Sequence, residues 1–186
     1  MVFSHMKFSS IISLLLLMCL SSIALSCKLD QTLQGYFVSN QEASNFVVYD
    51  IPMSLVSANN INLTADQEAA FESIDKLNIL GFSLEKNNSN QFQTELQIVH
   101  EILNNAPYEE LLRAGNNEEG KIILKYLGID EAIDELIIFG RINTKGFVII
   151  RVLGKDMSPN KIITLGNLID QLDFGQVPVN EVMEFF

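Results

Sequence analysis

The chain has 186 residues, 48% of them hydrophobic, and its 12 basic and 23 acidic side chains give a formal net charge of −11 at pH 7. This balance argues against nucleic acid as a partner, because binding to phosphates depends on clustered Lys and Arg. It also argues against electrostatic attachment to anionic lipid. The length suits one domain with a single hydrophobic core.

An apolar segment near the amino end predicts export. Its core, from Ile11 to Leu20, follows a short stretch that contains one Lys, Lys7. This charge order and length are typical of a secretory signal peptide, whereas a membrane-spanning helix needs roughly 20 apolar residues. We therefore expect residues 1–26 to be a lipoprotein signal peptide, and we exclude them from the fold.

The signal segment ends in Ala24-Leu25-Ser26-Cys27, which resembles the lipobox of bacterial lipoproteins, although Ala24 replaces the usual Leu. Cleavage would fall between Ser26 and Cys27, and the cysteine would carry diacylglycerol and an N-acyl chain. The alternative is an ordinary cleaved signal beside a cysteine. Because Cys19 would leave with the signal, Cys27 would then be a lone thiol in an exported protein, which is unusual unless it is modified. The sequence therefore predicts a lipid anchor on Cys27.

The predicted anchor is followed by a polar segment. Residues 27–43 are weakly patterned, and we interpret them as a lipidated tether with room for a short helix. A single domain is expected over residues 44–186, because no repeat and no low-complexity linker divides that part of the chain.

The first half of this domain predicts two strands and two helices. A strand over residues 45–55 has alternating apolar residues, namely Val47, Tyr49, Ile51 and Met53. A capping box of Thr64 and Gln67 begins a helix whose apolar residues have helical spacing, namely Phe71, Ile74 and Leu77. A strand over residues 78–85 precedes a second helix with one apolar stripe, formed by Phe92, Leu96, Val99 and Leu103.

The second half predicts four strands and a last helix. Short polar connections with Gly separate apolar runs, as in antiparallel hairpins, and the runs cover residues 108–114, 121–128, 136–142 and 147–154. Ser158 and Pro159 predict a capped helix whose inward stripe is Ile162, Leu165, Ile169 and Leu172. This order predicts an α+β fold: a mostly antiparallel sheet of about five to six strands with about three helices packed mainly on one face.

His100 is the one histidine outside the signal segment, so a hydrolase with a histidine base would have to use it. It falls at the flank of the apolar stripe of its helix. No nucleophile motif, zinc motif or phosphate-binding glycine loop accompanies it. We therefore expect a packed boundary histidine and no catalytic residue.

Four carboxylates are weak candidates for a metal site: Asp130, Glu131, Asp134 and Glu135. They form two pairs at i and i+4, but the alternating Asp and Asn with Gly that builds a calcium loop is missing. We expect a solvated helix start instead, which is a favourable place for carboxylates. No metal and no cofactor is therefore predicted, apart from the lipids on Cys27.

The last ten residues, 177–186, are unusually apolar and end in Met183, Phe185 and Phe186. We expect them to pack on the core. The alternative is a hook for a partner or for a second copy of the chain.

Several segments together resemble a family of short lipoproteins from Bacteroidota that is catalogued as domain of unknown function 4252. They are the cysteine-anchored signal, VVYDIPMSLV, IDKLNILGFSLE, YEELLRA, GKIILKYLG and IDELIIFGRINTKGFVIIRVLG. The resemblance implies a Gram-negative envelope and the outer membrane, and it supplies no catalytic residue. A single acid, Asp30, closely follows Cys27, so the sequence leaves open whether the protein faces the periplasm or the cell surface.

The expected function is therefore that of a lipid-anchored, non-enzymatic envelope protein that binds another protein or a small envelope component. The alternative is a hydrolase or a small-ligand-binding lipoprotein with a pocket between helices and sheet. An enzyme would gather titratable groups in a concave site around His100 or the acidic cluster. An interaction module would present an exposed apolar strip.

Overall fold

The computed structural model describes residues 32–58, 61–105, 107–116, 118–129 and 131–175. Six strands lie in these ranges: β1 Phe46–Pro52, β2 Ile74–Ser83, β3 Glu109–Gly115, β4 Gly120–Ile129, β5 Ala132–Ile142 and β6 Gly146–Met157. The helices there are α2 Leu33–Ser39, α3 Ala65–Glu72, α4 Ser89–Asn105 and α5 Pro159–Gly166, with 3-10 turns η1 Met53–Leu55 and η2 Ile169–Gln171. These elements confirm the predicted α+β class.

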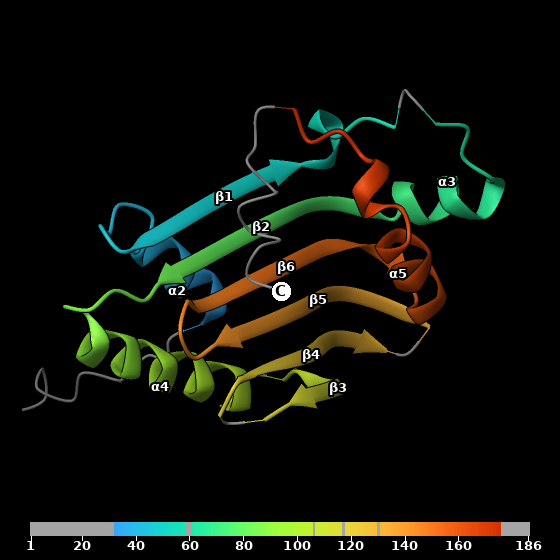
Figure 1. The fold of residues 1–186 in the computed structure, drawn as a ribbon. Coiled ribbons are helices and arrows are strands. Elements are labelled where there is room, and N and C mark those ends of the chain that lie inside the picture. The colour runs from blue at the N-terminus through green and yellow to red at the C-terminus, as the bar shows by residue number, and fades with distance from the viewer. Residues whose placement is uncertain (1–31, 59–60, 106, 117, 130, 176–186) are drawn as a thin grey trace, which may run out of the picture. The chain divides into compact units, whose positions relative to one another are not determined.

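The strands form one sheet in the order β1-β2-β6-β5-β4-β3 (Figure 1). Every neighbouring pair is antiparallel. The predicted hairpins β3-β4 and β5-β6 are therefore confirmed, and β4 and β5 form a third hairpin where a helix start was expected. Only β2 and β6 pair across a long stretch of sequence, and this pairing joins the two halves of the chain.

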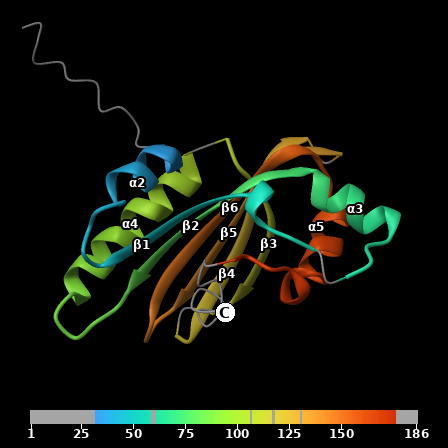
Figure 2. The same cartoon turned by 90° about the horizontal axis from the view of Figure 1, so that it is seen from above.

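Helices lie on both faces of the sheet (Figure 2). On what we call the α4 face, α2 and α4 pack over alternate residues of β5, among them Ile137 and Phe139. On the opposite face, called the α5 face, Leu136 of β5 belongs to a cluster with Ile162 of α5. The described residues thus contain one α-helix more than the sequence predicted for the domain, and the helices cover two faces rather than mainly one.

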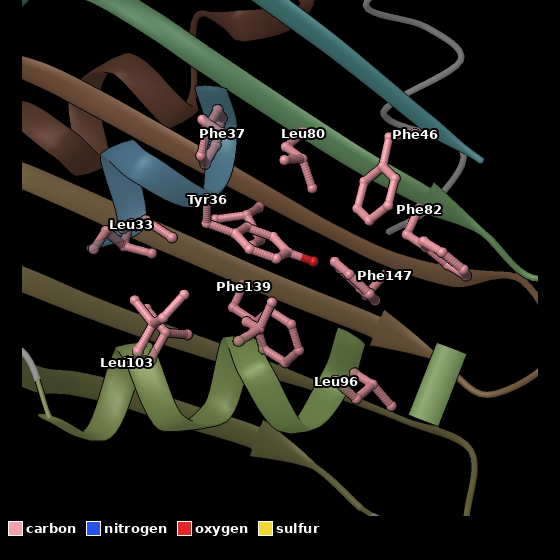
Figure 3. Packing of buried hydrophobic residues seen from close by; sticks show 14 of the residues in the cluster. Leu33, Tyr36, Phe37, Phe46, Leu80, Phe82, Leu96, Leu103, Phe139 and Phe147 are labelled. Carbon is pink, nitrogen blue, oxygen red and sulfur yellow. The ribbon is translucent and has the colours of Figure 1, made fainter. Parts of the chain in front are cut away.

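Aromatic rings dominate the core on the α4 face (Figure 3). Phe82 and Phe147 are register partners on β2 and β6, and their rings stack 5.4 Å apart. The ring of Phe46 meets Phe82 edge-on at 5.0 Å. The Tyr36 hydroxyl donates a hydrogen bond of 2.7 Å to Glu95 on α4, and burial, followed by that carboxylate, raises the pKa of Tyr36 far above its ordinary value.

Helix α2 belongs to the folded domain. The Thr32 side chain caps it by accepting from Gly35 N at 3.0 Å. Leu33, Tyr36 and Phe37, at helical spacing, are buried in the core of the α4 face. The domain therefore includes residues that the sequence placed in the tether, and its described part begins at Thr32 rather than at residue 44.

The helix predicted from Thr64 is shorter than expected. Its capping box is confirmed, but α3 ends at Glu72 and the chain continues into β2 at Ile74. The pairing of β2 with β6 shifts register between Ile74 and Lys76, so Ile74 and Leu77 reach the same face of the sheet. A bulged strand therefore reproduces the three-residue spacing of a helix.

Several predictions lie outside the described residues. These are the signal peptide, the cleavage and lipidation at Ser26 and Cys27, Asp130, and the packing of residues 177–186. Within the described ranges, no helix combines the length and the hydropathy that a membrane crossing requires.

Candidate functional site

The acidic stretch does not begin a helix. β4 ends at Ile129 and β5 starts at Ala132, so the chain reverses in a tight turn. Gly128 makes this turn possible, because it has φ +125° and a Cβ there would lie 2.5 Å from the carbonyl oxygen of Ala132. The predicted helix start is therefore wrong, and Glu131 instead lines an open hollow beside Glu109.

Glu135 is buried in an ion pair on the α4 face. Arg151 Nε donates to Glu135 Oε1 at 2.6 Å, and the two side chains are only 7% and 8% exposed. The Tyr108 hydroxyl donates to the same oxygen at 3.3 Å. Burial, with the nearby carboxylate of Glu135, raises the pKa of Tyr108 to about 12. Glu135, which the sequence made a weak candidate for a metal ligand, therefore forms an ion pair with Arg151.

Arg151 also fastens α2 to the sheet. Its Nη1 donates to Gln34 Oε1 at 2.5 Å, and its guanidinium carbon lies 5.6 Å from the ring centroid of Phe37. Arg151 thus contacts two residues of α2 and one of β5. This arrangement holds the first described helix in place. Among the described residues, no group of three or more His, Cys, Asp and Glu side chains could hold a metal ion.

His100 is half-buried on α4, with its ring edge-on to Phe139 at 5.7 Å. Burial lowers its pKa, and the positive charges of Arg141, Lys121 and Arg113 lower it further. Within the described ranges, no hydrogen bond joins His100 to a carboxylate or to a hydroxyl nucleophile. The geometry is that of a packed boundary histidine, and its surroundings disfavour the charged form.

An apolar cavity of about 170 Å³ lies between the α5 face of the sheet and the segment from α5 to Phe174. We call it the α5 cavity. Its floor comes from the strands β2, β5 and β6: Ile74, Leu77, Leu136, Ile138 and Val152. Its walls are Met53, Ile162, Leu165, Gly166, Ile169, Leu172 and Phe174. Every lining residue is apolar, so the cavity offers shape and hydrophobic contact without a polar side chain.

Local sequence fixes the wall of the cavity. Ser158 caps α5, with its hydroxyl accepting from Lys161 N at 3.4 Å, and Pro159 fits the first turn. Ile162 and Leu165 lie one turn apart on the side that faces the sheet. No residue of α5 is buried. The apolar side of this helix is therefore half-buried: Ile162 packs against the cluster that contains Leu136, and Ile162 and Leu165 both line the cavity.

A bridge closes the far end of this wall. Ser57 N and Asp173 N each donate to the carbonyl oxygen of the other residue at 2.9 Å. These two bonds hold the chain that follows η2 against the chain that follows η1. Phe174 and Met53 are thereby brought to the same cavity.

The sequence predicted the inward-facing residues that form part of the cavity wall, but not the strand residues that form its floor. The four residues of the predicted inward stripe of the last helix all line it: Ile162, Leu165, Ile169 and Leu172. The predicted helix is interrupted, however: α5 ends at Gly166, so Ile162 and Leu165 lie on α5, Ile169 lies on η2, and Leu172 follows η2. Of the floor residues, Ile74 and Leu77 belong to the apolar spacing of a predicted helix, whereas Leu136, Ile138 and Val152 lie in nearly continuous apolar runs.

Comparison with known proteins identifies the family. No curated protein and no solved structure matches the chain. A family model described as "Domain of unknown function (DUF4252)" matches residues 36–165, which is more than half of the 186 residues. The match includes all six described strands and ends within α5. The chain therefore belongs to the DUF4252 family.

Proposed function

We propose that this protein is a lipid-anchored protein of the cell envelope that binds the aliphatic chain of a small molecule in the α5 cavity and catalyses no reaction. The observation that carries the proposal is the wholly apolar lining of that cavity. A polar group placed there would lose its hydrogen bonds to water without replacement, which costs about 1–3 kcal/mol. The polar end of a ligand would therefore remain outside.

An aliphatic chain suits the site energetically. Ligand pockets in proteins are lined mostly by apolar side chains and bury most of the surface of the molecule that they bind. Each methylene that leaves water for such a site contributes about 0.8 kcal/mol. A ligand chain that fills the cavity would also add contacts to Ile162 and Leu165, which line it and are half-buried.

The titratable candidates do not support catalysis at this cavity. His100 packs against Phe139, which lies on the α4 face, and the cavity lies on the α5 face. Glu135 is paired with Arg151 on the α4 face. The sheet therefore separates the candidate acid and base from the place where a ligand would bind.

Filling the cavity should abolish ligand binding. We expect Leu165→Trp to occupy the α5 cavity and to reduce binding of a neutral apolar dye, N-phenyl-1-naphthylamine, at least tenfold. The matched control is Ile163→Trp, which introduces the same side chain at a neighbouring position of α5 that is 64% exposed. The dye would be titrated into each protein, and its fluorescence would be excited at a wavelength that Trp does not absorb. Equal binding by both variants would contradict the proposal, as would the absence of saturable binding by the parent protein.

The lipid anchor is proposed from the lipobox-like sequence before Cys27. We expect Cys27→Ser to abolish incorporation of radiolabelled palmitate and to release the protein from the outer-membrane fraction, because the thiol that would accept diacylglycerol is gone. Cys19→Ser is the matched control, since Cys19 lies in the segment that is removed. Label retained after Cys27→Ser, or lost after Cys19→Ser, would show that the anchor is not on Cys27.

A further inference from the structure

The edge strand β3 is uncovered along its whole length. All seven of its residues are exposed, including Leu111 and Leu112 at 42% and 52%. Among the described strands its one neighbour is β4, so its other side presents backbone N–H and C=O groups that no described strand pairs with. The opposite edge strand, β1, has two buried residues and ends at Pro52, which has no N–H to donate.

The sequence of β3 is self-complementary. It reads Glu110-Leu111-Leu112-Arg113, with opposite charges placed symmetrically about two leucines. Charges on an edge strand usually oppose pairing with another copy, because like charges then meet. In an antiparallel pair centred between the leucines, by contrast, each acid meets a base. The arrangement therefore favours pairing with an identical strand.

A bulge places the two charges on one side of the strand. The pairing of β3 with β4 shifts register between Glu110 and Leu112. Arg113 Nε donates to Glu110 Oε1 at 2.8 Å, a contact that a regular strand would not allow at this spacing, because residues three apart point to opposite faces. A second hydrogen bond runs from Arg113 Nη2 to Glu110 Oε2, so the two charges pair within the chain. They lie on the same face of the sheet, and pairing with a second copy would exchange this contact for the same contact between copies.

We propose that β3 pairs antiparallel with β3 of a second copy of this chain, so that Leu111 lies opposite the partner's Leu112 and Glu110 opposite the partner's Arg113. The two-fold symmetry of such a pair repeats each contact. The two sheets would join into one continuous sheet, with the α5 cavity of each copy left open at a distance from the contact strand. The inference is independent of the ligand proposed for that cavity.

The interface would be small. Stable dimers bury about 1,200–2,000 Å² in total, and one strand per copy provides less than this. We therefore expect a dissociation constant on the order of 10–100 µM. Charge pairs at such an exposed edge determine the register and the choice of partner more than the affinity.

Charge reversal and its rescue test the pairing. The full chain carrying Cys27→Ser, which removes the proposed acylation site, would be studied by sedimentation velocity from about 1 to 300 µM. We expect concentration-dependent dimerisation, weakened at least tenfold by either Glu110→Arg or Arg113→Glu. An equimolar mixture of these two variants should dimerise again, because both cross-copy contacts are then between opposite charges. Asp50→Arg on β1 is the control at the other edge and should not change dimerisation.

Three results would overturn the inference. The first is a monomer at every concentration. The second is dimerisation that either reversal leaves unchanged, which would place the contact on another surface. The third is a mixture that dimerises no better than its components, which would exclude the antiparallel register. Because Glu110 and Arg113 are exposed, circular dichroism spectra of the variants should match that of the parent protein.

Discussion

Replacing Arg151 by Met is expected to lower the free energy of unfolding by about 3–5 kcal/mol, since removing one partner of a buried ion pair leaves the other charge uncompensated. In this protein the orphaned group is Glu135, whose side chain is 8% exposed. The substitution also removes the hydrogen bond to Gln34 and the contact with Phe37 that fasten α2. Urea unfolding followed by circular dichroism would measure the loss.

Two further variants distinguish the buried charge from a general effect of the substitution. The double variant Arg151→Met with Glu135→Leu should recover most of the lost stability, because no unpaired charge remains. Lys76→Met breaks an exposed ion pair of 3.2 Å with Asp50 and should cost less than about 1 kcal/mol. A double variant no more stable than Arg151→Met alone would contradict this account of the ion pair.

Phe147→Ala is expected to destabilise the protein by about 3–5 kcal/mol, as is typical when a buried Phe is truncated. Phe147 is fully buried and contacts three other rings, of which Phe82 is stacked on it. Since Phe147 lies on β6, which pairs with β2 on one side and with β5 on the other, a cavity there weakens packing in both halves of the sheet. Urea unfolding would again measure the change in free energy.

Two control substitutions accompany Phe147→Ala. Phe147→Leu keeps most of the apolar volume and should cost less than the Ala variant. Val47→Ala, at a strand position that is 46% exposed, should stay within about 1 kcal/mol of the parent protein. A cost below about 1 kcal/mol for Phe147→Ala would show that the site collapses around the missing ring and that the aromatic cluster is not the main core.

Helix α4 could be predicted because it has one long apolar stripe. Four residues at helical spacing face the core, and all four are buried: Phe92, Leu96, Val99 and Leu103. Helix α2 carries the same signal in a shorter form, with Leu33, Tyr36 and Phe37 at i, i+3 and i+4. Seven residues are too few to distinguish this spacing from a weakly patterned tether.

Bulges account for the wrong secondary structure around Ile74 and near Glu135. A register shift brings Ile74 and Leu77 to one face of β2, and a second shift lies between Ile133 and Glu135 in the pairing of β5 with β6. Local periodicity does not distinguish a bulged strand from a helix when only two or three residues carry the pattern. Between residues 130 and 135 the pattern is one of charge: two acidic pairs at i and i+4 indicate a helix start, but the chain there passes from β4 into the bulged strand β5.

The burial of Glu135 could not be predicted from its neighbours in sequence. Its partner Arg151 lies 16 residues away, and the contact of Arg151 with Gln34 spans 117 residues. The residues that form the floor of the α5 cavity could not be predicted either, because the local sequence does not show which face of the sheet they lie on. Helices on both faces of the sheet make β5 and β6 nearly continuous apolar runs, so alternation does not show which residues face α5.

The central claim is that the α5 cavity binds an aliphatic chain, and methyl NMR of isoleucine residues during titration with 1-octanol tests it most directly. The cavity contains Ile74, Ile138, Ile162 and Ile169, and the core of the α4 face contains Ile123, Ile137 and Ile149 as an internal control. We predict saturable shifts confined to the first group. Unchanged spectra, or shifts centred on the second group, would contradict the claim.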